Sequence, residues 1–417
     1  MTDTNADRWV STAHRPMGFR EFVVIVAAIM ALNPLAMDMM LPALPEIGRA
    51  FHVGNPNHLQ NVLSVFLLGF GLGQFIIGPL SDRFGRKPIL IGGMIVYGVA
   101  SVLALLAPTF ETLLLARALQ GLSTSATRVI ATSVVRDCYS GRRMASVMSL
   151  TQMVFISVPV LAPSLGQAVL AVTHEWHGVF VVLLLAGIII LAWSALRLPE
   201  TLAPENRRSI ALRAVFGYFR EMLTNRQSFG YAIAAGFLTG TMFAYLFSAQ
   251  QVFTEVYRLG RYFPVVFAMI ALGVAVAGFV NSRLVGKLGM RKISHAALLA
   301  YIVTSVAMLI AALTQTLVLP LYMLLATASM FGFGLMISNF TALAMEPQGH
   351  IAGTASSLFG SITTLIGIVV GTTIGQAYDG TMVPLAAGFL LSTCGAFIAV
   401  LVTEKGRLFR QPPRRVM

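Results

Sequence analysis

Ten residues, Gly78-Pro-Leu-Ser-Asp82-Arg83-Phe-Gly85-Arg86-Lys87, separate two long apolar runs of this chain. They place three basic side chains and one acid in a very short polar interval. Glycines permit a tight turn between closely packed segments, and basic side chains hold such a turn on the cytoplasmic side of a membrane. The interval therefore predicts a cytoplasmic loop between two membrane-spanning helices.

The composition indicates that lipid is the main solvent of the chain. Of 417 residues, 57% are hydrophobic and only 11% are charged, whereas soluble domains carry about a quarter charged residues. The formal net charge of +13 does not indicate nucleic-acid binding, because the basic residues lie in short loops between apolar runs. Two cysteines, Cys138 and Cys394, have no paired spacing, so neither a disulfide framework nor a metal cluster is expected.

Twelve apolar runs are long enough to span a membrane, since about 20 residues cross about 30 Å of hydrocarbon. We expect the spans near residues 22–43, 59–80, 89–107, 111–135, 145–170, 176–197, 229–251, 262–285, 293–314, 317–343, 352–376 and 382–403. We therefore predict an all-α membrane protein with an N-terminal tail at 1–21, a six-helix bundle at 22–197, a cytoplasmic linker at 198–228, a second six-helix bundle at 229–403 and a C-terminal tail at 404–417.

The basic residues predict the orientation of the chain. Of the 29 Lys and Arg, 24 lie in the two tails and in the loops after the second, fourth, sixth and eighth spans. Three lie on the other side, namely Arg49, Arg258 and Arg261. By the positive-inside rule, both termini are expected to be cytoplasmic. The remaining two, Arg117 and Arg128, fall inside the fourth span.

A weak internal repeat supports two related halves. The segment Leu80-Ser-Asp-Arg-Phe-Gly-Arg-Lys87 aligns with Leu284-Val-Gly-Lys-Leu-Gly-Met-Arg291, and each follows the second span of its half. Parallel repeats of six spans are one architecture that transporters use. The second copy has Gly286 in the place of Asp82, so we expect any contact made by this acid to occur once.

The loop resembles the signature between helices 2 and 3 of the major facilitator superfamily. The resemblance implies the major facilitator fold, in which two six-helix bundles rock around a central cavity. It also implies a cytoplasmic gate formed by Gly78, Asp82, Arg83, Gly85, Arg86 and Lys87. In that family the acid docks on the positive N-terminus of helix 11, which here would lie near residues 351–356. The alternative is a loop that serves topology alone.

Further stretches resemble the bicyclomycin and chloramphenicol resistance branch of that superfamily, the Bcr/CflA-type drug:proton antiporters. They are Asp38-Met-Met-Leu-Pro42-Ala-Leu-Pro45, Arg117-Ala-Leu-Gln120-Gly121, Ala162-Pro163-Ser-Leu-Gly166-Gln167, and Met345-Glu346-Pro347 followed by Gly353-Thr-Ala-Ser-Ser357. The chain departs from the branch at Met40, where an aromatic residue is usual, and at Gln167, where Gly is common. These departures concern substrate preference more than fold.

Asp38 is the only carboxylate that we place well inside a span, which makes it the candidate for proton coupling. A charged group at such depth costs several kcal/mol unless it is paired, hydrated or protonated. An acid in a cavity that alternately wets and dries can therefore load and release a proton. The alternative is an acid at a helix end that reaches the periplasmic interface, because Pro42 and Pro45 follow closely.

Arg117 and Arg128 are the second and third candidates. Counting residues places Asp38 and Arg117 at a similar depth, about 8 to 9 Å below the periplasmic edge, so a salt bridge or a shared water is geometrically possible. Eleven positions bring the two arginines within about 20° of one helix face. The resemblance associates Arg117 with proton transfer, and Arg128 would attract anionic or electron-rich substrate groups. For both, the alternative is a structural arginine that binds backbone carbonyls.

Pro159, Pro163 and Gly166 interrupt the fifth span. Proline removes a backbone hydrogen bond and glycine admits close helix contact, so we expect a bend and tight packing. The resemblance assigns this stretch to the antiporter motif, with a part in conformational change and in preventing leak. A purely structural packing role is the alternative.

A cavity for varied amphipathic molecules needs aromatic and flexible apolar walls with a few polar groups. The candidates are Asn33, Met37, Gln120, Phe243, Tyr245 and Phe247. Core packing is the alternative for the aromatic side chains. Interhelical hydrogen bonds are the alternative for Asn33 and Gln120.

The sequence contains no phosphate-binding P-loop, so the energy is expected to come from an ion or substrate gradient, with no cofactor and no metal. Residues and resemblance together predict a monomeric, non-enzymatic transporter of the bacterial inner membrane. It would export small amphipathic compounds, such as antibiotics, in exchange for protons. A metabolite exporter or an uptake permease of the same fold is the first alternative. A membrane receptor or a lipid-processing enzyme is a remote one.

Overall fold

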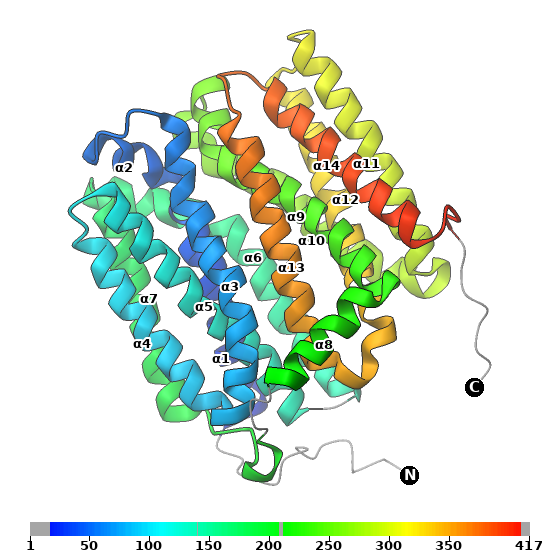
Figure 1. The fold of residues 1–417 in the computed structure, drawn as a ribbon. Coiled ribbons are helices and arrows are strands. Elements are labelled where there is room, and N and C mark those ends of the chain that lie inside the picture. The colour runs from blue at the N-terminus through cyan, green and yellow to red at the C-terminus, as the bar shows by residue number, and fades with distance from the viewer. Residues whose placement is uncertain (1–16, 140, 208–211, 410–417) are drawn as a thin grey trace.

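The computed structural model describes residues 17–139, 141–207 and 212–409, and the regular structure in these ranges is helical. Figure 1 shows long helices side by side, with the first half of the chain on one side and the second half on the other. The α-helices are α1 (Phe19–Asp38), α2 (Leu44–Ala50), α3 (Asn61–Phe84), α4 (Arg86–Leu105), α5 (Phe110–Cys138), α6 (Gly141–Thr173), α7 (His177–Arg197), α8 (Leu212–Thr224), α9 (Arg226–Gln251), α10 (Phe263–Leu288), α11 (Met290–Leu313), α12 (Leu319–Met345), α13 (Ala352–Gln376) and α14 (Val383–Thr403).

Ten helices of the described ranges are long and apolar enough to cross a membrane. They are α1, α3, α4, α7 and α9 to α14. Helix α5 has 29 residues but carries Arg117, Arg128 and several Ser and Thr residues. It is packed against α1, α3 and α4, and a helix surrounded by protein can carry more polar residues than one that faces lipid. In the described part of α6, Ser157–Thr173 is an apolar segment that is shorter than these ten helices.

The first predicted span, 22–43, is interrupted near its end. Helix α1 ends at Asp38, and a short 3-10 turn, Leu41–Ala43, connects it to α2. Pro42 and Pro45 follow this point, and proline has no N–H with which to continue the hydrogen bonding of a helix. Asp38 is therefore the last residue of α1.

The helices pack mainly within their own half of the chain. In the first half α5 lies against α3 and α4, and in the second half α9 lies against α13, α14 and α12. An added Cβ at Gly121 of α5 would collide with the carbonyl oxygen of Phe66 in α3, so glycine is required there. Between the halves, α3 packs on α13 and α6 packs on α10.

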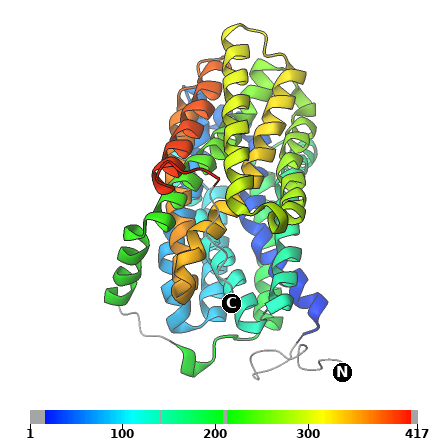
Figure 2. The ribbon, with the colours of Figure 1, turned by 90° about the vertical axis from the view of Figure 1, so that its right-hand side faces the viewer.

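We call the end of the molecule at which α3, α5, α7, α10, α12 and α14 finish the basic end, because the loop 83–87, Arg136, Arg197 and Lys287 lie there. The end at which α1 finishes and α2 follows is called the opposite end. Figure 2 shows α8, which belongs to the expected linker, at the periphery of the basic end. Its Phe219 stacks on Phe75 of α3, with the ring centroids 5.5 Å apart.

Candidate functional site

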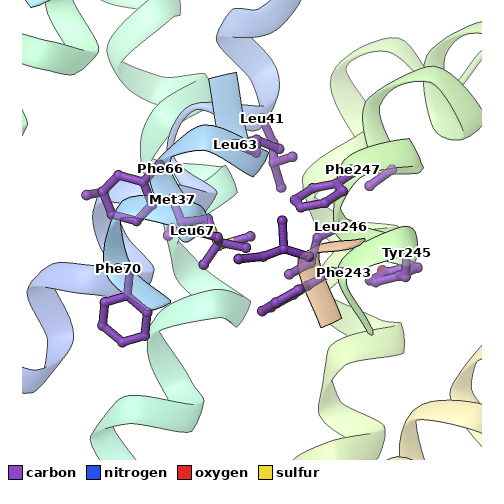
Figure 3. Close-up of a cluster of buried hydrophobic side chains, with 14 of the residues drawn as sticks. Met37, Leu41, Leu63, Phe66, Leu67, Phe70, Phe243, Tyr245, Leu246 and Phe247 are labelled. Atoms are coloured by element: carbon purple, nitrogen blue, oxygen red, sulfur yellow. The ribbon is translucent and has the colours of Figure 1, made fainter. Parts of the chain in front are cut away.

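Asp38 lies where the two halves meet. Its side chain is 2% exposed, and its Oδ1 atom has no hydrogen-bond partner among the described residues. Met37, the residue before Asp38, is among the side chains of the first half that lie opposite α9 of the second half (Figure 3). A buried polar atom without a partner is uncommon in proteins and calls for an explanation in function or hydration.

An apolar cluster fills the contact between α1, α3 and α9 next to this acid. Figure 3 shows Met37, Leu63 and Leu67 of the first half opposite Phe243, Leu246 and Phe247 of the second. All six side chains are buried. The rings of Phe243 and Phe247 stack with their centroids 5.9 Å apart. The cluster therefore holds the two halves together by apolar contact.

Tyr245 is turned away from that contact. Its ring stacks on Phe267 of α10 at a centroid distance of 5.3 Å, and its hydroxyl donates to the Phe267 carbonyl oxygen at 3.4 Å. Of the three aromatic side chains proposed as cavity walls, Phe243 and Phe247 thus face the first half, whereas Tyr245 packs inside its own half.

Arg117 is fully buried and connects three helices. Its Nε donates to the Val62 carbonyl of α3 at 3.1 Å, and its Nη2 donates to the Ala36 carbonyl of α1 at 3.2 Å. The guanidinium also lies 4.3 Å from the ring centre of Phe66. In the described part of the chain, no ion pair joins Arg117 to Asp38. Ala36 belongs to the last turn of α1, where unpaired carbonyls and the helix dipole attract a cation.

The polar candidates Asn33 and Gln120 make interhelical hydrogen bonds. Asn33 of α1 donates to the Thr124 hydroxyl of α5 at 3.1 Å. Gln120 accepts from Arg117 at 2.9 Å and donates to the Ser101 hydroxyl of α4 at 2.8 Å. Arg128 lies half-buried in α5, about three turns from Arg117 toward the basic end.

The Pro159, Pro163 and Gly166 stretch brings α6 against the turn that follows Asp38. An added Cβ at Gly166 would lie 3.0 Å from Cγ of Pro42 and would collide with the carbonyl oxygen of Met39. Both prolines lie inside α6, which packs on α1. The motif therefore contacts the backbone directly beside the buried acid.

At the basic end, Arg86 is the centre of the Gly78–Lys87 loop. Its side chain is buried and donates to Asp82 at 2.6 Å, to Asp137 at 3.0 Å and to the Ser81 hydroxyl at 2.7 Å. Asp82 thus pairs within its own loop. The expected contact of this acid near residues 351–356 would lie at the start of α13. The side chains of 351–354 lie outside the described residues, so this contact remains a prediction.

The other members of the loop have separate places. Gly78 lies beside Ser357 of α13, whose hydroxyl would be 3.4 Å from an added Cβ. The guanidinium of Arg83 lies 5.1 Å from the ring centre of Phe84. Gly85 joins α3 to α4 with a positive φ of 102°, a conformation that favours glycine.

Glu200 is a part of this site that the sequence reasoning missed. Its carboxylate accepts from the backbone N–H groups of Arg86 at 2.9 Å and Lys87 at 3.2 Å, which begin α4. An acid at a helix N-terminus satisfies unpaired N–H groups and complements the helix dipole. The signal was an acid just after the sixth span, at the start of a loop in which basic residues outnumber acids.

A similar arrangement occurs in the second half. Arg291 of α11 donates to Glu404 at 2.8 Å and lies 3.9 Å from Glu346. Glu346 follows the last residue of α12, just as Asp137 lies at the end of α5, the corresponding helix of the first half. An arginine–acid ion pair therefore lies at the basic end of each half, although Arg291 aligns with Lys87 and not with Arg86 in the sequence repeat.

At the opposite end, a network of side-chain amides joins the halves, and sequence reasoning missed it too. Gln60 donates to the side chain of Gln251 at 2.6 Å and to the Gly375 carbonyl at 3.0 Å. Gln251 donates to the side chain of Asn57 at 2.8 Å, and Gln376 donates to the Asn57 carbonyl at 2.8 Å. We call these residues the amide network. It connects the start of α3 to the ends of α9 and α13.

Comparison with known proteins identifies the family. The model of the Major Facilitator Superfamily matches residues 26–372. The bicyclomycin resistance protein homolog of Haemophilus influenzae is 30% identical over 91% of this chain and 94% of its own length. The MFS-type transporter YdgK of Bacillus subtilis is 31% identical over 95% of this chain and 98% of its own length.

A solved structure has the same fold. The partially occluded, inward-open xylose transporter XylE from E. coli matches with a TM-score of 0.70 at 13% identity, over 93% of this chain and 97% of XylE. Such a low identity shows the fold and not the substrate. The protein is thus a multi-pass membrane transporter and not an enzyme. With its family match over most of the chain, its apolar helices and its loop from Gly78 to Lys87, it belongs to the Major Facilitator Superfamily.

Proposed function

We propose that this transporter exports small amphipathic compounds, antibiotics among them, in exchange for protons, and that Asp38 carries the proton. The relative from Haemophilus influenzae that is named for bicyclomycin resistance supports the substrate class. The proton gradient would supply the energy. The single observation that carries the proposal is the burial of Asp38 between the halves with an unpartnered oxygen.

The position of Asp38 suits a proton carrier for a physical reason. An ionised carboxylate is costly in a dry site that offers no partner, so the burial of Asp38 beside the apolar cluster favours the neutral, protonated acid. When the halves separate at this point, water reaches the carboxyl group and the proton can leave. Movement of the halves is thereby coupled to proton release.

The proposal includes a topology. Twelve helices would cross the membrane as two six-helix bundles, and by the positive-inside rule the basic end and both termini would be cytoplasmic. The amide network would then close the periplasmic side, so that substrate enters from the cytoplasm. The chain would act as a monomer.

The test is uptake of a labelled antibiotic panel into inverted membrane vesicles with an imposed proton gradient. Wild type is compared with Asp38→Asn and with Asp379→Asn, an acid in the exposed turn between α13 and α14. We expect uptake that collapses with the gradient and with Asp38→Asn, while Asp379→Asn behaves as wild type. Uptake that ignores both the gradient and Asp38 would refute proton antiport. Gradient-driven flux of a metabolite alone would favour the metabolite carrier.

A further inference from the structure

A groove of about 510 Å³ runs between α9 and α14 on the outer surface of the second half. It is separate from the contact between the halves, and its lining is apolar except at one end. The residues that matter here are Arg226, Gly230, Phe237, Gly395, Ala399 and Thr403.

Two glycines in the lining of the groove allow α9 and α14 to pack closely. An added Cβ at Gly230 would collide with the Thr403 hydroxyl, and one at Gly395 would lie 2.9 Å from the ring of Phe237. Thr403 and Phe237 therefore occupy the space over these two glycines, and the groove lies outside this close contact of α9 and α14. On the same stretch of α14, Ile398 is 60% exposed, as expected for a surface that faces lipid rather than another helix.

The length of the groove corresponds to one leaflet of a bilayer. Arg226 and Phe237 line it along α9, and their separation in the sequence gives about 16 Å at 1.5 Å per residue. The hydrocarbon of a whole bilayer is about 30 Å thick. Because α9 begins at the basic end, the groove covers the leaflet on that side.

The mouth of the groove is positively charged. Arg226 is the first residue of α9, its side chain is exposed, and no acid pairs with it within the described ranges. Glu404 follows Thr403 but points inward, where it accepts from Arg291 at 2.8 Å and from the Tyr231 hydroxyl at 2.7 Å. This acid therefore does not neutralise Arg226.

We propose that the groove binds one anionic phospholipid, with the head-group phosphate on Arg226 and an acyl chain along Gly230, Ala399 and Phe237. Arginine binds phosphate through a fork of N–H donors, and a basic residue at the membrane surface attracts anionic lipids. The apolar walls exclude water from the acyl chain. The site is independent of the transported substrate.

The test is native mass spectrometry of the purified full chain, with phosphatidylglycerol and phosphatidylethanolamine of identical acyl chains added in equal amounts. We expect wild type to retain one phosphatidylglycerol in preference. Arg226→Gln should lower that preference about fivefold, the contribution of one basic residue near an anionic surface. The matched control is Arg283→Gln, an exposed arginine of α10 near the basic end and outside the groove. It should leave the preference unchanged.

A second variant tests the apolar part of the site. Ala399→Phe places a ring in the groove and should reduce retention of either lipid, while elution as a folded monomer shows that the helices still pack. If Arg226→Gln and Arg283→Gln lower the preference for phosphatidylglycerol equally, only general surface charge attracts the lipid, and the proposal is overturned. Unchanged preference in Arg226→Gln, or unchanged retention in Ala399→Phe, would overturn it as well.

Discussion

At the scale of single residues, Arg117 combines full burial with neutral partners. Its N–H groups donate to two main-chain carbonyls and one side-chain amide. The ring centres of Phe66 and Phe180 lie 4.3 and 5.9 Å from its guanidinium carbon. The guanidinium therefore acts as a cross-link of α1, α3 and α5. Because one of its acceptors is Ala36, two residues before Asp38, it also fixes the helix end that positions the acid.

We predict that Arg117→Lys lowers stability by about 1–3 kcal/mol. An ammonium group on a flexible stem cannot reach acceptors in three directions as the planar guanidinium does, so a buried acceptor loses its partner. The thermal unfolding midpoint in detergent measures this, with the exposed Arg83→Lys as a control that should unfold as wild type does. A variant that keeps the wild-type midpoint but loses gradient-driven transport would assign Arg117 to the chemistry instead.

The sequence predicts which residues are unusual but not what they touch. Asp38 and Arg117 are noticeable because ionisable residues are rare within spans. The acceptors of Arg117 are carbonyls 55 and 81 positions away in the sequence. Since every residue has a carbonyl, no side-chain pattern marks those two. The cross-link could be found only in the folded chain.

At the scale of elements, the approach of α6 to the end of α1 limits what can change beside Asp38. The contact consists of Gly166 against the backbone of Met39 and the ring of Pro42. A backbone oxygen cannot move aside as the tip of a flexible side chain can. Even a methyl group at Gly166 must therefore push α6 away from the turn or displace the turn itself.

We predict that Gly166→Ala costs about 1–3 kcal/mol of stability and reduces gradient-driven transport. The matched control is Gly92→Ala in α4, where an added Cβ meets nothing within 4 Å and the change should be neutral or stabilising. Both variants are compared by thermal unfolding and by uptake into inverted vesicles. If the two behave alike, the contact tolerates a methyl group and the stretch from Pro159 to Gly166 does not restrain the turn.

Helices that face lipid are the predictable elements of this chain. A helix that crosses a bilayer needs about 20 mostly apolar residues in a row, and ten helices of the described residues meet this requirement. Helix α5 is harder to recognise by apolarity because protein, not lipid, surrounds most of it. The amphipathic α8 lies in a segment that we expected only as a polar linker, because its 13 residues are too few to span a membrane.

At the scale of the whole molecule, two kinds of contact hold the halves together. The apolar cluster of Figure 3 lies between α1, α3 and α9, and the amide network closes the opposite end. Side-chain amides released from each other can bond to water, so each such bond contributes only about 1 kcal/mol net. Contacts of this strength suit an interface that would open in the proposed transport cycle. Gln60 and Gln251 are 191 positions apart, which is why no local pattern predicted them.

Removing Gln251 should therefore shift the transporter toward a state that is open at the opposite end. Gln251→Ala deletes its hydrogen bonds to Gln60 and Asn57, worth about 1–2 kcal/mol together, which corresponds to a five- to thirtyfold change in population.

The reporter of this opening is Met37→Cys, a buried position of the apolar cluster, in a chain whose Cys138 and Cys394 are replaced by Ala. A membrane-impermeant thiol reagent, added from the periplasmic side of intact cells, should label it faster by that factor. The neighbouring Gln250→Ala is the control, because the Gln250 side chain bonds, among the described residues, to Thr254 one turn farther along the same segment and to no residue of the first half. Equal labelling rates in the two variants would show that the amide network does not hold this end closed, and closure would then rest on the apolar cluster alone.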